Sequence, residues 1–151
     1  MKLKFLCARH RQQLEISTSK AVRCWQDGFD TAQFFYDQRL WSDAVCHAGC
    51  AFETAEILIA NKTIDYDVAC NWFYHSTVLL SAVLKNLDYD SQAGEVLFMA
   101  IDRFESELSA NSDGCERLLE NLNLLYKSAK VLNSEHSNGG SSYRSSNALC
   151  H

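Results

Sequence analysis

Apolar side chains recur at three- and four-residue intervals through residues 41–59, and this spacing constrains the fold more than any other feature of the chain. Such intervals place side chains on one face of an α-helix. The stripe consists of Trp41, Ala44, Val45, Ala48, Ala51, Phe52, Ala55, Leu58 and Ile59. Its regularly spaced alanines would let a neighbouring backbone approach closely. The spacing therefore predicts a helix that packs tightly against another helix.

The segment before it carries a second apolar stripe with helical spacing. This stripe consists of Ala21, Trp25, Gly28, Ala32 and Phe35, with Phe29 and Tyr36 beside it. Only residues 37–40 separate the two patterns, and such a short connection forces two helices to pack as antiparallel neighbours. Residues 25–59 are therefore predicted to form a helical hairpin.

The rest of the chain also favours an all-α fold. The 151 residues include no proline, whereas β-rich proteins depend on proline and glycine for their turns. A helix is predicted over residues 66–86, with Asp65 as its N-cap. Because this segment is apolar on nearly every side, we expect it to lie centrally. A fourth helix, capped by Asp88 or Asp90, should end near residue 108, and a fifth should follow a turn at residues 109–114, with Asp113 as a capping residue. About five antiparallel helices are thus expected.

The two ends of the chain are less regular. Residues 1–16 fit either a helix or a short strand, and a helix is favoured because the chain offers no partner strand. Ser17 is a suitable start for the helix that follows. From residue 133 the sequence is polar and has too little apolar content to offset the entropy of ordering. We predict a single helical domain over residues 1–132 and a flexible polar tail over residues 133–151.

Charge and sequence signals argue against several classes of function. The net charge of −5 disfavours binding to nucleic acid or to anionic membranes, because both require a basic surface. The first apolar run is too short for a signal peptide, and no run approaches the roughly 20 residues that span a bilayer. Seven cysteines without a disulfide framework indicate free thiols in a reducing cytoplasm. Acidic side chains are expected on outward helical faces: Glu53, Glu56, Glu95, Asp102, Glu105 and Glu107.

Equivalent positions recur with the offset of 49 residues that separates Ala44 from Ala93. Ala44, Ala48, Ala51 and Phe52 match Ala93, Leu97, Ala100 and Ile101, and Ala32 and Phe35 match Ser81 and Leu84. Residues 25–59 resemble a tetratricopeptide repeat, with Ala32 and Phe35 in the first helix and Trp41, Ala44 and Ala51 in the second at that family's packing positions. Residues 66–108 form a looser second unit. The resemblance implies stacked helical hairpins, and a closed helical bundle remains the alternative.

Cysteine and histidine residues form two candidate clusters for metal or thiol chemistry. Cys7 and His10 have the spacing of a ligand pair, and Cys46, His47 and Cys50 lie within about one helical turn. The four-ligand pattern is incomplete, and cysteine often serves as a small apolar residue in protein cores, so a metal- or thiol-dependent function is the alternative. No phosphate loop, metalloprotease motif or paired-carboxylate signature occurs. We therefore expect no enzymatic activity and no cofactor.

Aromatic residues outnumber the inward positions that five helices provide. They are concentrated in the first and third predicted helices, and the set consists of Trp25, Phe29, Phe34, Phe35, Tyr36, Trp41, Trp72, Phe73 and Tyr74. Consecutive aromatic residues point in different directions, so some should line a surface, where aromatic side chains serve as interface anchors. The alternative is that a central third helix and a covering amino-terminal segment bury them. His75, in an apolar helix, is expected to be buried and hydrogen-bonded, or else to face a ligand in a groove.

The family resemblance implies which residues would form such a groove, because the first helix of each tetratricopeptide pair lines the concave side. These residues are Gln26, Phe29, Gln33, Tyr36 and Asp37 in the first unit, and His75, Val78, Ala82, Lys85 and Asn86 in the second. We expect a protein–protein interaction module that acts as an adaptor, a chaperone-like cap or a regulatory subunit. A structural homodimer is a further alternative.

Overall fold

The computed structural model of the chain describes residues 3–111 and 116–138. This part of the chain forms α-helices and no strand, so the predicted all-α class is confirmed. The helices are α1 (Ala8–Ile16), α2 (Thr18–Asp37), α3 (Trp41–Asn61), α4 (Tyr66–Asn86), α5 (Asp90–Ala110) and α6 (Glu116–Asn138).

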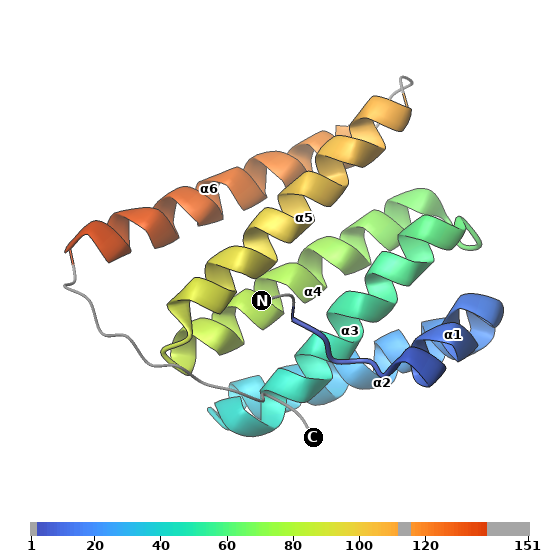
Figure 1. Cartoon of the computed structure of the whole chain (residues 1–151), viewed down its shortest axis with the longest axis horizontal. Coiled ribbons are helices and arrows are strands. Elements are labelled where there is room, and N and C mark those ends of the chain that lie inside the picture. The colour runs from blue at the N-terminus through green and yellow to red at the C-terminus, as the bar shows by residue number, and fades with distance from the viewer. Residues whose placement is uncertain (1–2, 112–115, 139–151) are drawn as a thin grey trace.

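From α2 onward, consecutive helices pack as antiparallel neighbours in chain order (Figure 1). Helices α2, α4 and α6 run in one direction and α3 and α5 in the other. Helix α4 contacts α2 on one side and α6 on the other, so these three parallel helices form one layer. Within the described residues, α6 contacts neither α2 nor α3. The helices therefore form an open stack whose two ends do not meet.

The core follows the predicted stripes. The four alanines at positions 44, 48, 51 and 55 are fully buried, and α2 approaches α3 so closely that a Cβ on Gly28 would lie 3.3 Å from the backbone oxygen of His47. Helix α4 is central, as expected. Its Phe73 ring lies 5.2 Å from Phe52 of α3 and 5.3 Å from Phe104 of α5, measured between ring centroids.

The two hairpins close through equivalent turns. Arg39 and Asp88 adopt left-handed backbone conformations, with φ of 59° and 61°. The next amide in each turn bonds back into the preceding helix at 2.9 Å, from Leu40 to the Phe35 carbonyl and from Tyr89 to the Leu84 carbonyl. This bond satisfies a carbonyl that the helix end would otherwise leave unpaired. The cap expected at Asp88 or Asp90 is wrong, because Asp88 is the left-handed turn residue and Tyr89 is the N-cap of α5, without a side-chain bond.

The amino-terminal segment is not helical before Ala8, so the helix expected over residues 1–16 is wrong for residues 3–7. This segment crosses α3 (Figure 1) because the carboxylate of Glu53 accepts hydrogen bonds from the backbone amides of Phe5, at 3.0 Å, and Leu6, at 2.8 Å. The predicted outward position of Glu53 is also wrong, since its exposure is 6%. Ser17 caps α2 as expected.

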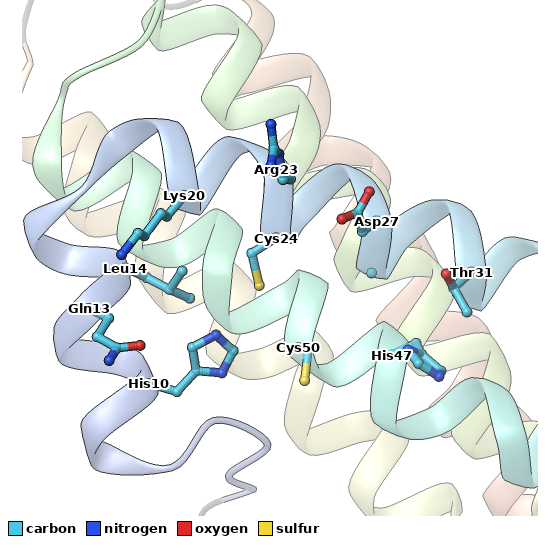
Figure 2. A pocket seen from close by; sticks show the side chains of 11 residues that line it. His10, Gln13, Leu14, Lys20, Arg23, Cys24, Asp27, Thr31, His47 and Cys50 are labelled. Carbon is cyan, nitrogen blue, oxygen red and sulfur yellow. The ribbon is translucent and has the colours of Figure 1, made fainter.

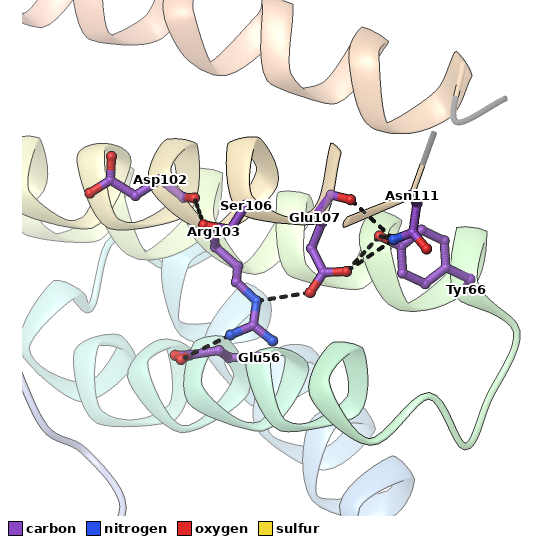
Figure 3. Close-up of polar contacts among 7 residues, drawn as sticks. All are labelled: Glu56, Tyr66, Asp102, Arg103, Ser106, Glu107 and Asn111. Carbon is purple, nitrogen blue, oxygen red and sulfur yellow. Dashed lines mark hydrogen bonds and ion pairs between the residues drawn. The ribbon is translucent and has the colours of Figure 1, made fainter. Parts of the chain in front are cut away.

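A polar network joins α3, α4 and α5 (Figure 3). Arg103 of α5 lies 3.4 Å from the Glu107 carboxylate and 4.0 Å from Glu56 of α3, and the former contact is an ion pair rather than an aligned hydrogen bond. The Tyr66 hydroxyl of α4 donates to Glu107 at 2.9 Å. The side chain of Glu107 is only 13% exposed, so its predicted outward position is wrong as well.

The carboxyl-terminal helix continues past the predicted domain boundary at residue 132 and ends at Asn138. The turn at residues 112–115, with its expected cap at Asp113, lies outside the described residues, as do residues 139–151. None of the described helices combines the length and apolar character needed to cross a membrane.

Candidate binding surface and pocket

Three aromatic rings form a ladder where α2 meets α4. The indole rings of Trp25 and Trp72 are nearly parallel, with centroids 4.0 Å apart and planes 2° from parallel. The Phe29 ring stacks against Trp25 at 5.0 Å. Trp25 is buried, and its Nε1 donates to the Ser76 hydroxyl at 2.8 Å. Phe29 and Trp72 are half-buried, so the ladder extends from the core to the surface of these two helices.

The groove residues expected on α2 lie on the side of the ladder and remain partly accessible. Gln26 and Asp37 are exposed, whereas Phe29, Gln33 and Tyr36 are half-buried. Gln33 donates to the Asp37 carboxylate at 2.9 Å, and Tyr36 packs edge-on against a neighbouring indole ring. These side chains thus have mainly local partners and keep one side toward solvent.

The groove residues expected on α4 are more accessible. His75, Val78, Lys85 and Asn86 are exposed and Ala82 is half-buried. The buried, hydrogen-bonded position considered for His75 is therefore wrong. Because α2 and α4 lie in one layer, the structure brings the two predicted sets onto adjacent helices.

Helix α6 adds a third apolar row that sequence reasoning did not include. Leu124 is 42% exposed and Val131 55% exposed, and both share a helical stripe with Glu135. Glu135 forms an ion pair with Lys85 of α4, so this stripe lies on the side of α6 that faces α4. We call the surface of Phe29, Trp72, His75, Val78, Leu124 and Val131 the α2–α4–α6 face. The packing of α6 against α4 brings Leu124 and Val131 onto this face, and the sequence of either helix alone does not reveal that alignment.

A separate cavity of about 480 Å³ lies between α1, α2 and α3 (Figure 2). Its lining residues are His10, Gln13, Leu14, Lys20, Arg23, Cys24, Asp27, Gly28, Thr31, His47 and Cys50. The structure thus brings together His10, His47 and Cys50 from the two predicted cysteine–histidine clusters. However, no three His, Cys, Asp or Glu side chains of residues 3–111 and 116–138 are arranged to hold a metal ion. Cys7 lies outside the cavity and caps α1, where its sulfur accepts from the His10 amide at 3.4 Å.

The Cys50 thiol is poorly suited to nucleophilic chemistry. Burial, the neighbouring Cys24 and the carboxylate of Glu53 raise the pKa of the Cys50 thiol to about 11. A thiol that stays protonated at neutral pH is a weak nucleophile. Cys24 lies 3.6 Å from the Thr54 hydroxyl. Cys7, Cys24 and Cys50 are free thiols, whereas Cys46 is disulfide-bonded, so the expected free state is wrong for Cys46.

The chain matches no protein-family model, no curated protein and no solved structure. The geometry of the chain offers two distinct candidate sites, the α2–α4–α6 face and the cavity between α1, α2 and α3.

Proposed function

We propose that this protein is a non-enzymatic interaction module that binds a segment of another protein along the α2–α4–α6 face. The observation that carries the proposal is the aromatic ladder at the α2–α4 contact, with uncovered aliphatic side chains beside it. Val78, Leu124 and Val131 are 38%, 42% and 55% exposed. Several exposed apolar side chains on one face mark an interaction site more often than apolar residues scattered singly do.

The arrangement of the helices supports this choice of face. An open stack presents the side of its parallel helices as an extended surface, whereas a closed bundle would turn that side into the core. The equivalent turns at Arg39 and Asp88 and the 49-residue offset support the further proposal that the hairpins are tetratricopeptide-like. In that arrangement α2 and α4 are the groove-lining helices, and α6 extends the groove.

The chemistry of the face indicates the kind of partner. Lys85 and Glu135 already neutralise each other across α4 and α6, so the charges on this face offer little net attraction. Affinity would come from burying the aromatic edges and the exposed valine and leucine side chains. An amphipathic helix with apolar anchors at three- and four-residue spacing matches these rows.

Charged substitutions on the face test the proposal. We expect Val78→Asp combined with Val131→Asp to abolish recovery of the partner in affinity capture from the native host. The control is Phe98→Asp, which changes a side chain that is 52% exposed on α5, outside the layer of α2, α4 and α6. The melting temperature should be nearly the same for all variants, because exposed substitutions typically change stability by no more than about 0.5 kcal/mol.

Two outcomes would redirect the proposal. Recovery of the same partner by the double variant and by the wild type would exclude the α2–α4–α6 face as the binding surface. If light scattering across a dilution series shows a dimer that the double variant converts to a monomer, the face serves self-association, which is the homodimer alternative.

A further inference from the structure

The cavity between α1, α2 and α3 lies on the opposite side of α2 from the aromatic ladder. Its α2 residues, Lys20, Arg23, Asp27 and Thr31, recur at three- and four-residue spacing and therefore occupy one helical face. Trp25 and Phe29 are on the other side of the same helix. A ligand in the cavity would consequently leave the α2–α4–α6 face accessible.

The inner part of the cavity is apolar. Leu14 is 2% exposed, and the Cys24 and Cys50 thiols lie beside it in the lining, with Gly28 in the α2 wall. Figure 2 shows His10, Cys24 and Cys50 converging between the three helices. With the Cys50 thiol protonated, this region offers uncharged sulfur and carbon atoms to a ligand.

The rim of the cavity carries an excess of cationic side chains. These are Lys20 and Arg23 of α2, and Asp27 is the single acidic lining residue. Neither Lys20 nor Arg23 forms an ion pair with any residue that the structure describes. The chain has an excess of acidic side chains, with a net charge of −5. These two cations nevertheless lie beside an apolar recess without an ion-pair partner among the described residues.

From these observations we propose that the cavity binds a small amphiphilic monocarboxylate. Its hydrocarbon part would lie against Leu14, Cys24 and Cys50, and its carboxylate would lie at the rim near the Lys20 ammonium group. Arg23, whose side chain points away from the recess in Figure 2, would add a more distant positive charge. Cavities of roughly 300–1,000 Å³ with an apolar lining and a few convergent polar groups are typical of small-molecule sites, and the volume of about 480 Å³ falls in this range.

The single acidic residue favours a monoanion over a dianion. Asp27 shares the rim with Lys20 and Arg23, so a phosphate group would bring two negative charges near a carboxylate. The repulsion grows with the ligand's charge. The apolar recess also gives no favourable contact to inorganic phosphate, whereas it would bury a short alkyl chain.

Octanoate is a suitable probe, with octylamine, octanol and inorganic phosphate as comparison ligands for the full-length protein. We expect saturable binding of octanoate by calorimetry, a rise in melting temperature through mass action, and amide chemical-shift changes at Cys24, Gly28 and Cys50. Octylamine and phosphate should produce no saturable change, and octanol should bind more weakly than octanoate.

Charge variants test the proposed carboxylate contacts in both directions. Lys20→Glu combined with Arg23→Glu should weaken octanoate binding by about tenfold or more, since a charge-assisted hydrogen bond is among the strongest contacts of a ligand. Asp27→Asn should strengthen octanoate binding, because it removes the repelling carboxylate. The matched control, Arg117→Glu with Lys127→Glu, makes the same change in net charge on α6 and should leave octanoate binding unchanged.

Several results would overturn the proposal. Equal affinity for octanoate and octylamine, or for octanoate and octanol, would show that the rim cations do not select the ligand. If phosphate shifted the same amide signals, the site would recognise negative charge without needing the alkyl chain. Absence of saturable octanoate binding to wild-type protein with unchanged amide spectra would exclude the cavity as a monocarboxylate site.

Discussion

The carboxylate of Glu53, in the middle of α3, lies 2.8 Å from the backbone nitrogen of Leu6, which is 47 positions earlier in the chain. Its other oxygen accepts from the adjacent amide of Phe5 at 3.0 Å. A buried carboxylate is unfavourable without such donors, and an extended segment needs acceptors for its amides. Each group therefore satisfies the other, and residues 3–7 are held across α3.

Replacement of Glu53 by glutamine should release this segment. Glutamine offers one acceptor oxygen and presents an NH₂ donor to the second amide, so a buried backbone donor loses its partner. We expect a loss of about 1–3 kcal/mol in the free energy of unfolding. Chemical denaturation measures this change, and hydrogen exchange at Phe5 and Leu6 should become faster. The control is Glu120→Gln, at an exposed position of α6. Equal stability of the two variants would show that the Glu53 contacts contribute little.

The ring of Phe5 occupies the space where a side chain on Gly49 would begin, because a Cβ at Gly49 would overlap the ring atoms. Gly49→Ala should therefore destabilise the protein by about 1–3 kcal/mol, the usual cost of overpacking. In a Phe5→Ala background the sign should reverse, since alanine is favoured over glycine in a helix by roughly 1 kcal/mol. A double-mutant cycle measured by urea unfolding tests this coupling.

Gly94 provides the matched control for that cycle. A Cβ there would meet Leu132 at 3.4 Å, an ordinary contact, so Gly94→Ala should stabilise the protein or leave it unchanged. If Gly49→Ala were as well tolerated as Gly94→Ala, the close contact between Phe5 and α3 would not form in solution.

The hydrogen bond between the Trp25 indole and Ser76 predicts the effect of a single-atom deletion. Ser76 is fully buried and its hydroxyl accepts from Trp25 Nε1 at 2.8 Å. Ser76→Ala leaves the indole N–H without this acceptor, and we expect a loss of about 1–3 kcal/mol in unfolding free energy. Ser106→Ala, which removes an exposed hydroxyl on α5, should change stability by no more than about 0.5 kcal/mol. A cost for Ser76→Ala no larger than this control would argue against the bond.

Alkaline pH should destabilise the fold through two groups with raised pKa. Burial, then the hydrogen bond to Glu107, raises the pKa of Tyr66 above its ordinary value of 10.0, and the pKa of Cys50 rises from 9.0 to about 11. The folded state holds these protons more tightly than the unfolded state. Their contribution is therefore complete below about pH 9 and declines as the pH rises through the unfolded and toward the folded pKa values.

Unfolding free energies measured between about pH 8 and about pH 11.5 test this linkage. We expect Tyr66→Phe and Cys50→Ala each to reduce the slope of stability against pH above about pH 9, with the Cys50 variant acting at the lower end of that range. An unchanged slope in the double variant would show that neither proton is held by the fold.

The sequence alone determined those features that depend on neighbours within a few positions. The helix at residues 66–86, the turn between Asp37 and Trp41 and the caps at Ser17 and Asp65 all agree with the structure, because backbone hydrogen bonds and apolar periodicity act over three to five residues. The offset between the two hairpins was visible for the same reason. The left-handed turn residues Arg39 and Asp88 have the same 49-residue offset as the buried alanines Ala44 and Ala93.

Tertiary structure decided the features that join distant segments. The burial of Glu53, the extended path of residues 3–7, the exposure of His75 and the cavity lined by His10 and Cys50 each depend on which helices meet and in which register. A glutamate on a helix faces solvent or core according to its partners, and periodicity along one helix carries no information about the neighbour's backbone amides. Residue spacing thus fixed the helices, while long-range packing positioned the surfaces and polar groups available for binding.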